Sequence, residues 1–234
     1  MRFDLSPNAA VDIMLVGQEQ SPVIRIDNVL RDPTYLVRYA EQEAKFEAVA
    51  GNLYPGVRAA MPLDYVEGAV RALDPLIRQT YDIGGAKLAN AECFFSIVTT
   101  PPDALLPFQK IPHIDTSHPL HFAVVHFLCG EPFSGTGFYR QAATGFEKIT
   151  PAREPLWASA RDEALLQLPD DAGYIDQRSS DYQRIGVVDA VFDRLILYPS
   201  NLLHSGAIQD GMNFSADPQI GRLTANFFIG YHSA

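Results

Sequence analysis

The sequence predicts a mainly β fold, a sandwich or barrel of short strands with helices flanking it. Beyond Gly85 most apolar segments are short, aromatic and β-branched, without helices between them. Before Gly85 apolar residues recur at helical spacing, which indicates a helical layer. The chain has 234 residues, of which 47% are hydrophobic, so it can bury one sizeable core, and we expect a single domain over 1–234.

Residues 1–88 are expected to provide a strand and helical support. Apolar and polar side chains alternate over 23–27, as in a short edge strand. The spacing of apolar residues predicts one helix over 33–48 and, after a loop containing Pro and Gly, a second over 64–84 that Pro75 kinks. We expect both helices to form a packing layer that carries no chemistry.

Residues 89–234 are expected to form the barrel. The predicted strands lie at 93–98, 122–128, 137–139, 186–188, 195–198 and 223–229. An insertion at about 141–182 contains a short helical segment among charged residues, and we expect it to lie outside the barrel. Trp157, in this insertion, is expected either to cap a substrate or to anchor its helix to the barrel.

Charge and composition exclude several classes of partner. A net charge of −10 and a pI near 4.9 cannot provide the basic surface that nucleic acid or an anionic membrane requires. No segment approaches the roughly 18 apolar residues of a membrane span, and the N-terminus lacks a signal-like apolar stretch. Cys93 and Cys129 stand alone, as buried thiols of a reducing compartment do. We therefore expect a soluble, cytoplasmic protein.

Three side chains have the composition of a metal site. His113 and Asp115 are two residues apart, a spacing that points both side chains to one face of a strand. His204 follows the predicted strand 195–198, where a side chain can point into the mouth of a barrel. A lone His-x-Asp pair is common by chance, but two imidazoles and one carboxylate make the facial triad of non-haem Fe(II) enzymes, with three positions open. These three residues are the predicted metal ligands.

A row of polar residues follows His204. Arg222, Thr224 and Asn226 share one face of a predicted strand, and such a row is costly to bury without a ligand. The Arg guanidinium is a planar fork of donors that matches a carboxylate, and Thr adds a hydroxyl. We expect them to bind the distal carboxylate of 2-oxoglutarate, although Arg222 also fits an ion-paired surface position and Thr224 is a good strand former.

His126 is the last candidate for cofactor binding. It lies with His121 in one predicted strand at an odd separation, so the two side chains face opposite sides and cannot both line a cavity. A hydrogen-bonded core histidine is the alternative for His126. Tyr139 and Tyr198 are expected either to reach the site or to be buried with satisfied hydroxyl groups.

These residues resemble the pattern of the Fe(II)/2-oxoglutarate-dependent dioxygenases, in particular their prolyl-hydroxylase-like branch. The resemblance rests on His113-x-Asp115, on the distal His204, and on Arg222 with Thr224 two residues later, in the family's order. It implies a double-stranded β-helix, which is a jelly-roll or cupin-like barrel, supported by N-terminal helices.

The resemblance covers roughly residues 90–231. Residues 135–140 and 198–206 are similar to the fourth and seventh barrel strands of that branch. The distal His and the Arg are further apart than is usual in the family, so 211–221 must loop out.

By this resemblance the protein would be an oxygenase that decarboxylates 2-oxoglutarate to succinate and CO2 and hydroxylates a small-molecule or peptide substrate. Substrate contacts are expected from 99–112, 140–182 and 205–221, since long segments near a site usually carry specificity. Two alternatives stay open: a non-catalytic cupin-like metal-binding module, and a metal-dependent hydrolase or isomerase that uses metal-bound water. Neither the substrate nor the oligomeric state follows from the sequence.

Overall fold

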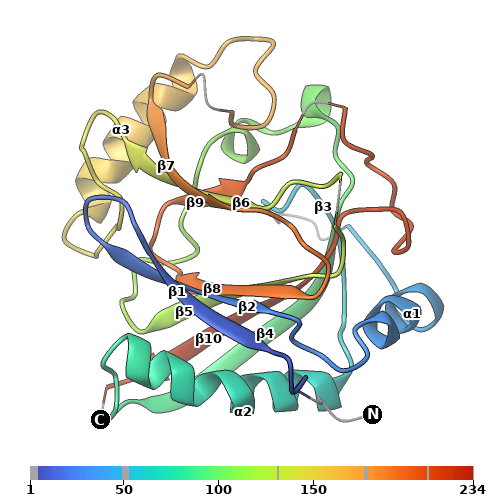
Figure 1. Cartoon of the computed structure of the whole chain (residues 1–234). Coiled ribbons are helices and arrows are strands. Elements are labelled where there is room, and N and C mark those ends of the chain that lie inside the picture. Colours follow the sequence, from blue (N-terminus) through green and yellow to red (C-terminus); the bar gives the residue numbers. More distant parts are fainter. Residues whose placement is uncertain (1–4, 49–52, 131, 177–178, 210, 234) are drawn as a thin grey trace.

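The computed structural model describes residues 5–48, 53–130, 132–176, 179–209 and 211–233 (Figure 1). Its strands are β1 (Ala10–Val16), β2 (Ser21–Asp27), β3 (Gly56–Ala59), β4 (Lys87–Val98), β5 (His121–Phe127), β6 (Thr136–Gln141), β7 (Tyr182–Val188), β8 (Arg194–Pro199), β9 (His204–Gly206) and β10 (Leu223–His232). Its helices are α1 (Thr34–Gln42), α2 (Leu63–Thr80) and α3 (Glu154–Leu166), with 3₁₀ turns η1 (Pro102–Ala104) and η2 (Pro107–Lys110). The fold is mainly β with flanking helices, as the sequence predicts.

The strands form two antiparallel sheets. The larger has the order β1-β2-β8-β5-β10-β4-β3, and the smaller has the order β7-β6-β9. From β4 onward the chain passes repeatedly between the sheets, because β4, β5, β8 and β10 lie in the large sheet while β6, β7 and β9 lie in the small one. A bridge between His113 and His204 brings the segment between β4 and β5 beside β9. Figure 1 shows α2 across the outer face of the large sheet and α3 beside the small sheet.

Two apolar cores hold these layers together. The first core lies between the large sheet and the helices, where alternate residues of β10 pack against the buried face of α2. The β10 residues are Leu223, Ala225, Phe227 and Ile229, and the α2 residues are Tyr65, Ala69, Val70, Leu73 and Ile77. The second core lies between the two sheets, where the residues of β5 that face the small sheet, Ala123, Val125 and Phe127, pack against Phe138 of β6. Each large apolar side chain buried in this way contributes about 1.5–3 kcal/mol. The even-numbered residues of β10 are thereby turned toward the small sheet.

The N-terminal elements depart from the prediction in several places. The predicted strand 23–27 lies in β2, which is internal, because β1 pairs with it along its whole length and forms the edge. Helix α1 ends at Gln42 and not at 48, since the backbone of Glu47 pairs with that of Arg58 at 2.9 and 3.0 Å. Strand β3 occupies part of the predicted loop.

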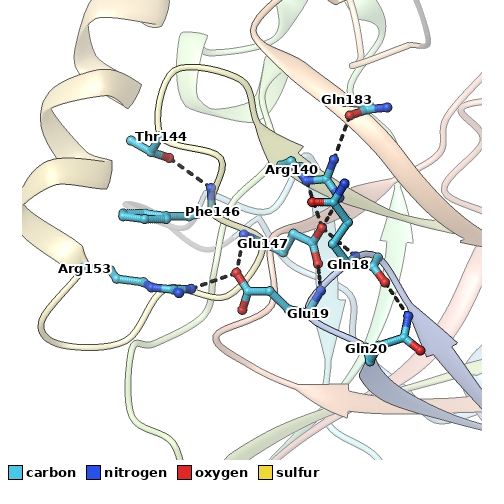
Figure 2. A network of polar contacts seen from close by, with 10 residues as sticks. Gln18, Glu19, Gln20, Arg140, Thr144, Phe146, Glu147, Arg153 and Gln183 are labelled. Carbon is cyan, nitrogen blue, oxygen red and sulfur yellow. Dashed lines mark hydrogen bonds and ion pairs between the residues drawn. The ribbon is translucent and has the colours of Figure 1, made fainter.

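A buried carboxylate ties the β1–β2 turn to the loop between β6 and α3 (Figure 2). Glu147 is fully buried and accepts the backbone N–H groups of Gln18 at 3.0 Å and Glu19 at 2.9 Å. The Arg140 guanidinium donates to the same carboxylate through Nε at 2.9 Å and through Nη2. Gly17 has φ +70°, and a Cβ there would lie 2.2 Å from Glu147 Oε2. Burial alone would raise the pKa of Glu147, but these donors together hold it below 4.5.

The predicted insertion at about 141–182 contains α3 and the segments around it. α3 lies outside both sheets, as expected (Figure 1). Residues 177–178 of the insertion lie outside the described residues. None of the described helices has the length and apolar character needed to cross a membrane.

Candidate metal centre and its cavity

The backbone brings the three predicted metal ligands together. His113 and His204 form an antiparallel bridge in which each N–H donates to the other's carbonyl at 2.9 Å. Their imidazole centroids are consequently 4.5 Å apart. The backbone N–H of Asp115 donates to the carbonyl of Ser200 at 2.9 Å, which holds Asp115 beside the segment that leads to His204. One ligand atom from each of His113, Asp115 and His204 lies within 4.8 Å of the other two.

The hydrogen bonding suits metal coordination by these side chains. His204 Nδ1 lies 2.8 Å from the carbonyl of Leu202, and because a carbonyl only accepts, Nδ1 carries the proton. Nε2 is then the nitrogen with a free lone pair, and it lies 3.8 Å from Asp115 Oδ2. His113 Nε2 lies 4.0 Å from Asp115 Oδ1. Both separations are too long for hydrogen bonds and leave room for a cation between the donors.

Burial sets the protonation states of the triad. It lowers the pKa of His204, which is buried, to about 4; desolvation on the cavity side and repulsion from His204 also lower the pKa of His113, whose side chain is 52% exposed. Burial raises the pKa of Asp115 above its ordinary value, against the attraction of His113 and His121. Both imidazoles are therefore neutral near pH 7, which is the form that coordinates metal ions. The donor set of two neutral imidazoles and one carboxylate fits Fe(II).

The triad opens into a cavity of about 570 Å³ between the two sheets. Its volume is typical of sites for small molecules. Arg222, Thr224 and Asn226 all line it, so they share a face as predicted. Much of the remaining lining is apolar and includes Val98, Ile111, Ala123, Val125, Ile208 and Phe228.

Arg222 is a buried cation, with only 5% of its surface exposed. Its Nε donates to the carbonyl of Ser134 at 2.9 Å and its Nη2 donates to the carbonyl of Gly135 at 2.8 Å. No carboxylate within the described part of the chain pairs with it. Beside it, the Thr224 hydroxyl donates to Asn226 Oδ1 at 2.7 Å. A buried guanidinium without a counter-ion is costly, so an anionic ligand in the cavity fits this position.

The expectation that His126 binds a cofactor is wrong. Its side chain faces α2 and does not line the cavity, because Ala123 and Val125 occupy the inward positions of β5. His126 is fully buried, with Nδ1 2.8 Å from the Tyr65 hydroxyl and Nε2 3.0 Å from Asp193 Oδ1. It is the hydrogen-bonded core histidine of the alternative interpretation.

The other aromatic candidates divide between the cavity and the core. Tyr198 lines the cavity, and its ring centroid lies 4.8 Å from that of His204. Tyr139 is buried in the apolar cluster beneath α3 and is not part of the lining. Trp157 belongs to that cluster and also lines the cavity, so it anchors α3 and reaches the site.

Arg58 lines the cavity but was missed in the sequence, because β3 lies in a segment expected to be a loop. Pairing of Arg58 with Ser96 on β4 sets its position. Its guanidinium carbon lies 4.9 Å from the centroid of the Tyr54 ring and 5.2 Å from that of Phe94. A four-residue strand offers too little alternation to recognise from the sequence.

Several solved structures are distantly similar to this chain. HygX from Streptomyces hygroscopicus, with nickel, 2-oxoglutarate and hygromycin B bound, is 13% identical, covers 91% of this chain and 84% of its own, and has a TM-score of 0.48. SnoN, a non-haem α-ketoglutarate-dependent epimerase from nogalamycin biosynthesis, is 12% identical, with coverages of 91% and 79% and a TM-score of 0.44. An N-substituted L-amino acid dioxygenase from Burkholderia ambifaria is 11% identical, with 99% of both chains covered and a TM-score of 0.43. Similarities this low do not carry an activity over to this chain.

The family assignment comes from the sequence. No curated protein sequence matches the chain. Residues 7–229 match DUF6445, which is described as a family of unknown function. Since this match spans nearly all of the 234 residues, the chain belongs to the DUF6445 family.

Proposed function

We propose that this chain is an Fe(II)- and 2-oxoglutarate-dependent oxygenase, built on a double-stranded β-helix, that hydroxylates a small-molecule or peptide substrate in the cytoplasm. One observation carries the proposal: the clustered side chains of His113, Asp115 and His204 open into the same cavity as Arg222, a buried cation without a carboxylate partner among the described residues. The passage of consecutive strands between two sheets supports the β-helix. The order of these residues along the chain supports the prolyl-hydroxylase-like branch.

When bound, Fe(II) and 2-oxoglutarate supply an oxidant made from O2, with release of succinate and CO2. His113, Asp115 and His204 would hold the ion from one side and leave positions open toward the cavity. The carbonyl of Leu202 keeps His204 in the tautomer whose Nε2 can coordinate.

Arg222 would bind the distal carboxylate of the cofactor. The carbonyls of Ser134 and Gly135 hold its guanidinium in place, and no acceptor in the described residues takes the protons of Nη1. Thr224 adds a hydroxyl beside it. The apolar lining limits the water that reaches the reacting groups. Neither a metal-binding module nor a metal-dependent hydrolase needs this arginine, so Arg222 favours the oxygenase over both.

The Arg222→Met substitution tests the proposal. Calorimetric titration of the Co(II)-loaded protein with 2-oxoglutarate should give affinity that is weaker by roughly 10- to 150-fold in the variant, because a hydrogen bond to a charged group is lost. Co(II) affinity should not change. Arg71→Met is the matched control, since the Arg71 side chain is 77% exposed on α2.

Wild-type protein that binds Co(II) but not 2-oxoglutarate would contradict the proposal and favour a metal-binding module. Unchanged 2-oxoglutarate affinity in Arg222→Met would remove Arg222 from the cofactor site.

A further inference from the structure

We propose that the substrate of this site carries a carboxylate and that Arg58, on β3, binds it. The inference rests on the proposed function, because the charges in the cavity are counted with Fe(II) and 2-oxoglutarate bound. It extends that function by naming the chemical class of the substrate and the residue that selects it.

Arg58 has no polar partner in the described part of the protein. No Asp or Glu there forms an ion pair with it, and its Nε is buried without a hydrogen-bond acceptor. The rings of Tyr54 and Phe94 stabilise the cation through their faces but offer no acceptor to its buried Nε–H. Burial lowers the pKa of Arg58 against the attraction of Asp115 and Glu92, neither of which forms an ion pair with it, so the cost of desolvating the charge outweighs that attraction. An acceptor supplied by a ligand would remove this cost.

A second arginine that lines the cavity differs from Arg58 because it has a carboxylate partner. Arg161, on α3, also lines the cavity, but it donates to Asp162 Oδ1 from Nε at 2.9 Å and from Nη2 at 2.7 Å. Its charge is thereby neutralised within the protein. Next to it, Trp157 is 6% exposed and its Nε1 is a buried donor without a partner in the described residues. The cavity therefore presents one cation besides Arg222 that no ion pair within the described residues compensates.

The charge count favours a monoanion. Fe(II) contributes two positive charges, Arg222 and Arg58 contribute one each, and Asp115 contributes one negative charge. The two negative charges of 2-oxoglutarate leave one positive charge in a cavity of low polarity, where an unbalanced charge is costly. A single carboxylate restores neutrality. The net charge of −10 on the whole chain argues against general attraction of anions, so the selection must be local.

The residues that line the cavity indicate the character of the rest of the substrate. Around the mouth and walls lie Leu53, Phe108, Ile111, Tyr174, Ile208 and Phe228. These side chains suit an apolar or aromatic body. A phosphate ester would bring a further negative charge, whereas an organic acid with an apolar body satisfies both the charge and the lining.

The test compares an acid with its uncharged amide. Full-length protein loaded with Zn(II) and 2-oxoglutarate is titrated calorimetrically with 3-phenylpropanoate and with 3-phenylpropanamide. Wild type should bind the acid at least about tenfold more tightly than the amide, and Arg58→Gln should reduce the acid to the affinity of the amide. Arg161→Gln is the matched control and should change the acid's affinity by less than about threefold. A change in the fluorescence of Trp157, the single tryptophan, during the titration would place the probe in this cavity.

Two further measurements separate the alternatives. Arg58→Gln should keep its 2-oxoglutarate affinity; loss of that affinity would assign Arg58 to the cofactor and overturn the inference. Arg58→Lys retains the charge without the planar fork, so it should bind the acid with intermediate affinity, and it replaces Arg58→Gln if that variant does not fold. Equal weakening by Arg58→Gln and Arg161→Gln, or no weakening by Arg58→Gln, would also overturn the inference.

If the wild type does not bind 2-oxoglutarate, the proposed function fails. The same acid and amide titration on protein loaded with Zn(II) alone then decides the inference. Binding of the acid that depends on Arg58 would support the inference, and no Arg58-dependent binding of the acid would overturn it.

Discussion

Replacing Glu147 by Gln should destabilise the protein by about 2–4 kcal/mol. Glu147 is fully buried, and Arg140, whose side chain is 17% exposed, loses its counter-ion in the variant. Removing one partner of a buried ion pair costs about 3–5 kcal/mol. Gln keeps one acceptor oxygen and recovers about 1 kcal/mol of hydrogen bonding. Its amide group, however, directs N–H donors at the backbone N–H of either Gln18 or Glu19.

Urea unfolding at pH 7, followed by the fluorescence of Trp157, measures this loss. Glu163→Gln makes the same chemical change at an exposed position of α3 and should alter stability by no more than about 0.5 kcal/mol. A loss below about 1 kcal/mol for Glu147→Gln, or a loss equal to that of the control, would refute the importance assigned to the buried carboxylate.

The pH dependence gives an independent check. The pKa of Glu147 in the folded protein lies below its ordinary value, so its stabilisation is fully present once the pH is well above the unfolded-state pKa and is lost as the pH falls through the folded-state pKa. The difference in stability between the wild type and Glu147→Gln should therefore be constant above about pH 5.5 and shrink below pH 4.5. A difference that grows with acidity would contradict the assignment.

Two further substitutions test the packing around the site. Gly17→Ala should destabilise the protein by more than about 1 kcal/mol, because the residue has φ +70° and its new Cβ would meet the Glu147 carboxylate; thermal unfolding measures this, and an unchanged melting temperature would contradict the geometry. Tyr65→Phe should cost about 1–2 kcal/mol, because it removes the hydroxyl bonded to His126, while leaving Co(II) affinity unchanged. Weaker Co(II) binding in this variant would mean that His126 acts on the metal site after all.

The candidate site could be predicted where its geometry depends on local spacing. Arg222, Thr224 and Asn226 share a face because side chains alternate along β10, and this period is visible in the sequence. His113 and His204 were predicted from their chemistry and from the strand before His204, although the backbone bridge that joins them spans a long stretch of sequence. That residues 1–234 form a single domain stays a prediction.

The parts that were missed depend on contacts between distant segments. β3 exists because its residues pair with β4. Arg58 pairs with Ser96, 38 positions later, and no local pattern in the sequence predicts such a pairing. The sequence shows that His121 and His126 face opposite sides, but only the packing of α2 against β5 shows that the side of His126 faces away from the cavity. β1 was overlooked because its residues do not alternate between apolar and polar, and its apolar residues Ile13 and Leu15 remain exposed.

Anaerobic titration of the Fe(II)-loaded protein with 2-oxoglutarate tests the proposed metal and cofactor site most directly. A bidentate 2-oxo acid on Fe(II) produces a weak visible charge-transfer band. The band should form in the wild type and in His232→Ala, an exposed histidine near the C-terminus, and should be absent in His204→Ala. Absence of the band in wild-type protein that has bound Fe(II) would contradict the dioxygenase assignment.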